Sequence, residues 1–356
     1  MSDRSGCAPV DLAVLGALDA ATAGRPRSYV RSARALAGIE ERIGLGPRYA
    51  YEVLLDLARP WIIPVRAVVA MGNIGDRSFP ATAGSGYTEC RPSYAGQLAL
   101  DTEADRLAPV PLGLINGTTY RGGTQPALEP FRALAALRRL LDDPGVPDAE
   151  LISLAGPPYS VTGCAITGNI AALMRGRRVT LRESGRIAVT GVPVPEAPAD
   201  PPPRAPGGML VAFGGVGPVP PRPAHLVIES LPLGAMTTDV VHAIVNRAAS
   251  RPRADPHPGL ARTTALPVAD VDEQSGRDGG VRILVTLRPG SDPETVRDQL
   301  AGIHGVSAES YYQFPAPLAI LLRSWVERYR REDLRASLAA LEDAIRRDRQ
   351  RERRNR

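Results

Sequence analysis

The sequence predicts a mixed α/β (α+β) protein with a helical N-terminal region, a following region of strands and helices, and a helix at the C-terminus. Apolar residues recur at helical spacing within residues 11–58, where glycines at positions 44 and 46 interrupt the pattern. From residue 129 onward, segments rich in β-branched residues are interleaved with amphipathic segments, which is typical of domains that mix strands and helices.

Composition sets the broad class of the protein. The chain of 356 residues is long enough for two or three domains, and its 44% hydrophobic and 23% charged residues are ordinary for a soluble globular protein. All 43 basic residues are arginine and the formal net charge is +5, which permits nucleic-acid binding without requiring it. The three cysteines form no metal or redox motif, so we expect no metal site in this chain.

No apolar run approaches the roughly 20 residues of a membrane span, and the N-terminus has no secretory pattern. We therefore expect a cytoplasmic protein without membrane contact.

Three helices are predicted in the N-terminal region. The first covers residues 11–23, the second begins near Ser28 and runs to Ile39, and the third covers residues 48–58. Residues 44–47 (Gly-Leu-Gly-Pro) force a turn before the third helix, because glycine adopts the φ values that a sharp corner needs. Two helices joined by a tight glycine turn are typical of a helix-turn-helix, whose second helix contacts DNA.

The most informative stretch covers residues 62–91. An apolar run at residues 62–71 leads into Gly-Asn-Ile-Gly, and a loop of small residues then leads to Tyr87, which is followed by Thr-Glu-Cys-Arg. This stretch resembles the active-site segment of the A subunit of type IIA DNA topoisomerases, the gyrase A subunit and the topoisomerase IV A subunit. In that family a Gly-Asn-Phe-Gly turn precedes an Arg-Tyr-Thr-Glu-x-Arg motif. The spacing from Gly72 to Tyr87 matches the family pattern without a gap.

Weaker matches extend the resemblance over residues 11–348. Residues 49–58 resemble the family's recognition helix, and residues 114–119 resemble its Val-Asn-Gly-Ser-Ser segment. Residues 156–159 resemble a Gly-Pro-Asp-Phe turn, and residues 271–276 resemble an acidic turn before a strand.

Further elements are predicted from periodicity and composition. Helices are expected at residues 93–102, 129–142, 238–249, 293–300 and 318–329. Strands are expected at residues 179–182, 186–190, 225–229 and 281–287.

The resemblance implies a division into three regions. Residues 9–108 would form a winged-helix DNA-cleavage domain that carries the active-site tyrosine. Residues 109–330 would form a tower-like α/β domain with a flexible Pro/Gly-rich insertion at residues 193–223. Residues 331–356 would form a basic helix, the C-terminally truncated start of a coiled-coil stem. The arginines from Arg346 onward are interpreted either as a solvated or disordered tail or as an arm that binds phosphates.

The resemblance also implies a chemistry. Tyr87 would attack the DNA backbone and form a 5′-phosphotyrosyl intermediate, with Arg91 as the cation that the motif retains. DNA contacts are expected from Arg31, Arg34, Arg42, Arg48 and Arg77. The expected partners are double-stranded DNA, a second copy of the chain in a homodimer, and a gyrase-B-type ATPase subunit. Mg²⁺ and ATP are both expected on that subunit; a chain without lysine has no Walker-type phosphate loop.

Departures from the family pattern leave two hypotheses open. Gly86 stands where the family has arginine, residues 43–45 replace a His-Pro-His, and the glycine-rich segment that carries a DNA-wedging isoleucine is shortened to residues 120–124. Loss of one pre-positioned cation typically costs about 100–1000-fold in rate. The chain is therefore either the DNA breakage-reunion subunit of a topoisomerase, or a catalytically weakened paralogue. The paralogue would bind DNA or the gyrase-B-type subunit and modulate the host topoisomerase.

Overall fold

The computed structural model describes most of the chain. The described residues are 7–22, 28–37, 39, 44, 46–78, 81–103, 109–120, 123–190, 223–249, 265–276 and 280–354. Arg42 and nearly all of the insertion predicted at residues 193–223 lie outside them.

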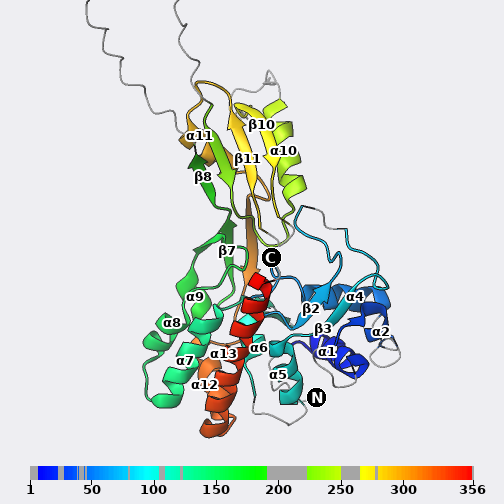
Figure 1. The fold of residues 1–356 in the computed structure, drawn as a ribbon. Helices are drawn as coiled ribbons and strands as arrows, with labels where there is room; N and C mark the ends of the chain where they lie inside the picture. The colour runs from blue at the N-terminus through cyan, green and yellow to red at the C-terminus, as the bar shows by residue number, and fades with distance from the viewer. Residues whose placement is uncertain are drawn as a thin grey trace, which may run out of the picture.

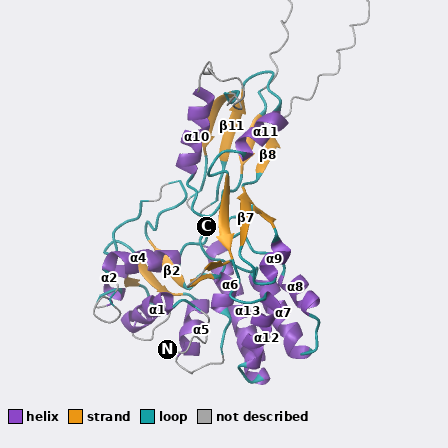
Figure 2. Cartoon of the chain, turned by 180° about the vertical axis from the view of Figure 1, so that it is seen from behind, coloured by secondary structure: helices purple, strands orange, loops and turns teal. Residues whose placement is uncertain are grey.

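The protein is a mixed α/β fold, as the sequence predicts, and every pairing between its named strands is antiparallel. Figure 1 shows an upright molecule with a head at the top, a sheet below it and two groups of elements at the base. Figure 2 shows from behind that the N-terminal lobe lies on one side of the base and a group of helices on the other. These helices are α7 (Pro130–Asp142), α8 (Asp148–Ala155), α12 (Leu318–Glu327) and α13 (Arg331–Arg354).

The N-terminal lobe combines helices with a three-stranded sheet of order β1-β3-β2. Its elements are α1 (Pro9–Thr22), β1 (Val30–Arg31), α2 (Ser32–Ala35), α4 (Pro47–Asp56), β2 (Val68–Met71), β3 (Glu89–Pro92) and α5 (Tyr94–Glu103). Helix α1 buries the apolar face that its periodicity predicts, including Leu15 and Leu18. Helix α4 starts with Pro47, whose missing N–H is not needed in a first helical turn. Before it, Gly44 has φ +69°, as the predicted turn requires.

The helix predicted from Ser28 to Ile39 is wrong in its first half. Val30 and Arg31 form strand β1, which pairs with Cys90 and Glu89 of β3, and α2 begins only at Ser32. Local apolar spacing does not foresee this, because a distant strand supplies the hydrogen-bonding partners.

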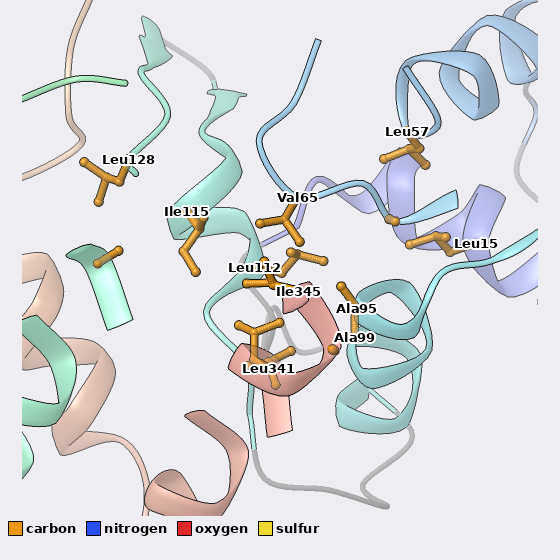
Figure 3. Packing of buried hydrophobic residues seen from close by; sticks show 14 of the residues in the cluster. Leu15, Leu57, Val65, Ala95, Ala99, Leu112, Ile115, Leu128, Leu341 and Ile345 are labelled. Carbon is orange, nitrogen blue, oxygen red and sulfur yellow. The ribbon is translucent and has the colours of Figure 1, made fainter. Parts of the chain in front are cut away.

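The base of the molecule is held together by one apolar core that joins the N-terminal lobe to the helices opposite. In Figure 3, Leu341 and Ile345 of α13 lie close to Leu112, with Ala95 and Ala99 of α5 beside them. Leu112 belongs to α6 (Leu112–Asn116), which precedes the hairpin of β4 (Thr118–Tyr120) and β5 (Gly123–Gln125).

Two further sheets rise above this base. The middle sheet, of order β12-β7-β6, is made of β6 (Ala165–Gly168), β7 (Val179–Ser184) and β12 (Ser307–Tyr312), with α9 (Ile170–Met174) between the first two. The head has a four-stranded sheet of order β10-β11-β9-β8, covered by two helices that share a second apolar core with it. Its elements are β8 (Ile187–Thr190), β9 (His225–Ile228), α10 (Thr237–Ala249), β10 (Val268–Glu273), β11 (Ile283–Leu287) and α11 (Pro293–Ala301). Strand β10 takes up the first half of residues 271–276, the segment predicted as an acidic turn.

The C-terminal arginines are not a disordered tail as far as the structure describes them, because α13 remains helical to Arg354. The guanidinium of Arg349 lies 4.8 Å from the ring centre of Phe131, and that of Arg351 lies 5.1 Å from the ring centre of Tyr94. On the same helix, the Asp348 carboxylate accepts hydrogen bonds from the Tyr94 and Ala95 amides at 3.3 Å, at the start of α5. A negative charge is favoured there, since the first amides of a helix have no internal partners.

Within the part of the chain that the structure describes, no helix combines the length and the apolar character needed to cross a membrane.

The lobe contains a buried carboxyl that should make its stability depend on pH. Burial, together with the nearby charge of Asp56, raises the pKa of Asp11 from 3.8 to about 6. The folded state therefore holds this proton more tightly than the unfolded state. The resulting stability is fully present below about pH 4 and is lost as the pH rises through 6. We predict that Asp11→Asn stabilises the protein by about 1–3 kcal/mol at pH 7.5 and has little effect at pH 4.

Urea unfolding at both pH values measures this effect. Asp142→Asn is the control, because Asp142 is exposed on the surface and paired with Arg335. Equal effects of Asp11→Asn at the two pH values would contradict the prediction.

Candidate active-site loop

The segment between β2 and β3, residues 72–88, holds Tyr87 and Arg77, two of the predicted site residues. Its Gly-Asn-Ile-Gly turn is closed by Asn73, whose side-chain oxygen accepts from the Gly75 amide at 2.9 Å and whose carbonyl accepts from the Ala83 amide at 2.9 Å. Gly72 has φ +96°, and a side chain there would approach the Tyr87 carbonyl at 3.1 Å. Both conditions favour glycine at this position.

Tyr87 lies in a tight turn at the end of this loop and projects into solvent. Its amide donates to the Gly84 carbonyl at 2.8 Å, while its side chain is 86% exposed. Gly86, just before it, is also exposed, and no atom lies within 4 Å of the position that a Cβ would take. The tyrosine that the sequence identifies is therefore accessible to a large partner.

Buried hydroxyl groups lie at the base of the turn. The Tyr51 hydroxyl of α4 donates to the Ala83 carbonyl at 2.8 Å and lies 2.9 Å from Thr88 Oγ1. Thr88 Oγ1 in turn donates to Ser32 Oγ of α2 at 2.9 Å. The Ser32 amide donates to the Thr88 carbonyl, and the Ala33 amide donates to the Ser85 carbonyl. Sequence analysis did not single out Tyr51, Thr88 or Ser32, because these groups come from separate segments.

Arg91, predicted as the catalytic cation, is only 5% exposed. It donates to the Pro92 carbonyl at 3.1 Å, and its guanidinium carbon lies 5.1 Å from the ring centre of Tyr29. Its charge also acts on Asp348 of α13: burial raises the pKa of that carboxyl, and Arg91 is among the groups that oppose the rise. In this structure Arg91 is part of the junction between β3 and the C-terminal helix.

Arg77, predicted to contact DNA, is 3% exposed and reaches the head of the molecule. Its Nη2 donates to the carbonyls of Leu231, Pro232 and Ala235 at 2.7–3.0 Å. Its own carbonyl accepts from the Thr237 amide at 2.9 Å. Burial lowers the pKa of Arg77, and the charges of Cys164 and Glu183 oppose that change. Figure 1 shows the loop rising from the N-terminal lobe toward the lower end of α10.

A second contact with the head lies beside the first. The hydroxyl of Ser78 donates to a carboxylate oxygen of Glu273, at the end of β10, at 3.0 Å. The loop is thus fixed to the head near its start and to α4 and α2 near its end. These acceptors are more than 150 residues away in sequence, so no local pattern signals the contacts.

Three of the predicted DNA-contacting arginines lie on the surface of the N-terminal lobe. Arg31 and Arg34 are exposed at the two ends of a segment whose Ser32 and Ala33 amides bond to the tyrosine loop. Arg48 is exposed in the first turn of α4. The structure thus brings Arg31 and Arg34 to the edge of the Tyr87 turn.

Comparison with protein-family models and with curated proteins gives no match for the chain. Among the described residues, no group of three or more His, Cys, Asp or Glu side chains is arranged to hold a metal ion. The features that indicate a function are therefore the loop, its surroundings and the resemblance of its motif.

The buried guanidinium of Arg77 makes a testable contribution to stability. We predict that Arg77→Met, which keeps the length of the side chain and removes its donors, destabilises the protein by about 1.5–3 kcal/mol. The reason is that the carbonyls left behind are buried without partners. Urea unfolding measures the loss, and hydrogen exchange at the Thr237 amide should report loosening of the loop from the head.

Arg186→Met serves as the control, because the Arg186 side chain is 70% exposed and its nearest carboxylate, of Glu229, is 4.0 Å away. A similar, small effect of both substitutions would show that Arg77 does not brace the loop.

Proposed function

We propose that this chain is the DNA breakage-reunion subunit of a type IIA topoisomerase, in which Tyr87 is the nucleophile. The observation that carries the proposal is the exposure of Tyr87 in a loop that hydrogen bonds fix to the head near its start and to α4 near its end. A nucleophile that attacks duplex DNA must project from the protein and yet keep its place. Tyr87 meets both conditions.

Two features of the fold support the finer assignment of domains. The order α2, Gly44 turn, α4 and the antiparallel sheet β1-β3-β2 agrees with a winged-helix domain, in which α4 would be the recognition helix. The middle sheet and the head, which stand above this lobe in Figure 1, agree with a tower-like domain. In the proposal, exposed Arg31, Arg34 and Arg48 bind phosphates on either side of the tyrosine.

The proposed reaction conserves the number of phosphodiester bonds. The Tyr87 oxygen bonds to phosphorus, the bond from phosphorus to the 3′-oxygen breaks, and a 5′-phosphotyrosine and a free 3′-hydroxyl result. The phenolic proton passes to solvent, to which the exposed side chain has direct access, and the 3′-oxygen takes up a proton as it leaves. Attack by that hydroxyl reverses each step and restores the DNA strand.

Other components of the reaction are assigned to partners. From the resemblance, we propose that Mg²⁺ and ATP are held by a gyrase-B-type subunit. A homodimer would bring a second Tyr87 to the opposite DNA strand.

One observation favours the second hypothesis, that the chain is a weakened paralogue that binds DNA or the gyrase-B-type subunit. The space beside Gly86, where the family has an arginine, is open, and Arg91 is buried against Tyr29 and the Pro92 carbonyl. A developing charge on phosphate would then depend on cations from the partner subunit, or from Arg31 and Arg34.

We predict that the chain binds double-stranded DNA without strong sequence preference and that affinity falls steeply as salt rises, because neutralised phosphates release counterions. Replacing Arg31, Arg34 and Arg48 by glutamine should weaken binding and reduce the slope of log K against log salt by up to about 3. The control replaces three exposed arginines near the middle sheet, Arg175, Arg177 and Arg186. Fluorescence anisotropy at several salt concentrations measures both variants; an unchanged slope in the first would remove these arginines from the DNA site.

We predict that the chain, mixed with a gyrase-B-type subunit, Mg²⁺ and supercoiled plasmid, forms a covalent adduct with DNA 5′ ends. Tyr87→Phe should abolish the adduct, because it removes only the nucleophilic oxygen. Tyr311→Phe is the matched control, since Tyr311 is also an exposed tyrosine (64%) but belongs to β12. Gel analysis of detergent-trapped complexes measures the yield.

The same assay separates the two hypotheses. Gly86→Arg should raise the adduct yield, by up to about 100–1000-fold if the missing cation is the main defect. The substitution fits sterically, because the site is open and Gly86 has no positive φ. An absence of adduct from both the unchanged chain and this variant, with DNA binding intact, would favour the second hypothesis, the weakened paralogue.

A further inference from the structure

Three buried hydroxyl groups meet below the Tyr87 turn, and each comes from a different segment of the lobe. Tyr51 of α4 is 8% exposed, Thr88 is 1% exposed, and Ser32 of α2 is fully buried. Burial raises the pKa of Tyr51, and its hydrogen bond to Thr88 opposes that change. The three side chains therefore act as neutral, hydrogen-bonded groups inside the protein.

The Tyr51 hydroxyl contacts both sides of the turn that presents Tyr87. It donates to the carbonyl of Ala83 at 2.8 Å and lies 2.9 Å from Oγ1 of Thr88. These two residues flank the four residues 84–87, whose ends are joined by the bond from the Tyr87 amide to the Gly84 carbonyl. One phenol from the neighbouring helix thus fixes the width and the position of the turn.

The direction of Tyr87 is linked to Thr88, which follows it in the chain. Thr88 is buried, whereas Tyr87 beside it projects outward. Thr88 is anchored through its side chain to Ser32 and through its carbonyl to the Ser32 amide. Any movement of Thr88 would therefore move Tyr87.

If residue 51 contributed only to stability, an apolar side chain would be sufficient there. A phenylalanine at position 51 would fill the same space, and buried polar networks generally contribute more to the uniqueness of a conformation than to its free energy. The hydroxyl of Tyr51, which a phenylalanine would lack, therefore distinguishes a positioning role from ordinary packing.

We propose that Tyr51 is a positioning residue that, with Thr88 and Ser32, holds the turn so that Tyr87 is presented to DNA. The inference rests on the proposed function, because it concerns the reaction of Tyr87. It assigns to Tyr51 no contact with DNA or with the reacting atoms.

The test uses the full chain with a gyrase-B-type subunit, Mg²⁺ and plasmid. Tyr51→Phe should lower the yield of covalent adduct about tenfold, the factor that corresponds to the loss of one or two hydrogen bonds, while DNA affinity changes little. The melting temperature should fall only slightly, because the Ala83 carbonyl is half-buried and Thr88 keeps its bond to Ser32. Tyr312→Phe is the matched control, because it also removes a single hydroxyl, which donates to Glu183 at 3.0 Å, but it belongs to β12 and lies outside the N-terminal lobe.

A second pair of variants tests the hydroxyl of Thr88 separately from its shape. Thr88→Ser retains the hydroxyl and should retain adduct formation, whereas Thr88→Val has the same shape without it and should reproduce the loss. Combining Thr88→Val with Tyr51→Phe should add little, because both substitutions break the same link.

Hydrogen exchange keeps this inference distinguishable from the proposed function. The Ala33 and Tyr87 amides, which donate to the Ser85 and Gly84 carbonyls, should exchange faster in Tyr51→Phe than in the unchanged chain, whether or not the chain cleaves DNA. If the unchanged chain forms no adduct, the proposed function and the catalytic part of the inference both fail, and the exchange rates still decide whether Tyr51 holds the turn. Full adduct yield with unchanged exchange in Tyr51→Phe would overturn the inference. A parallel loss of DNA affinity and melting temperature would overturn it as well, because it would indicate a purely structural role.

Discussion

The attachment of the tyrosine loop to the head through Arg77 is the interaction on which the arrangement of the candidate site depends. A buried guanidinium is costly unless its donors are occupied, and here the dipoles of three carbonyls occupy Nη2. These carbonyls belong to the segment that leads into α10, so the position of the head determines where the loop can lie. At its other end the loop rests on α4 and α2. Tyr87 is therefore located by two parts of the molecule that have separate apolar cores.

Sequence patterns predicted the fold class and most of the longer elements for a clear physical reason. Helices such as α7 and α12 bury one face, so their apolar residues recur at helical spacing. Strands such as β9 and β11 lie in the buried middle of the head sheet and are rich in β-branched and aliphatic residues. The misses include strands whose partners are remote. Strand β1 has only two residues and exists because β3 lies beside it, and β12 carries Glu309 and Ser310 on an edge that is largely exposed.

The site shows the same division. The exposed tyrosine followed from a motif in consecutive residues, and so did the glycine turn before it. The environments of Arg77 and Arg91 did not follow from any local motif. Arg77 was predicted as a DNA contact and Arg91 as the catalytic cation. Both side chains instead end inside the protein, against carbonyls from the head and against Tyr29. Burial of an arginine is decided by residues far along the chain, and a single sequence gives no sign of them.

The bonds from Asp348 to the amides of Tyr94 and Ala95 span about 250 positions of the chain. The first turn of α5 therefore acquires its negatively charged partner only after α13 has been synthesised. Contacts of such long range slow folding, because a large loop must be closed before they form. During translation the apolar face of α5 would stay uncovered until α13 leaves the ribosome. The lobe and α13 therefore complete their packing together, although residues 104–330 lie between them in the sequence.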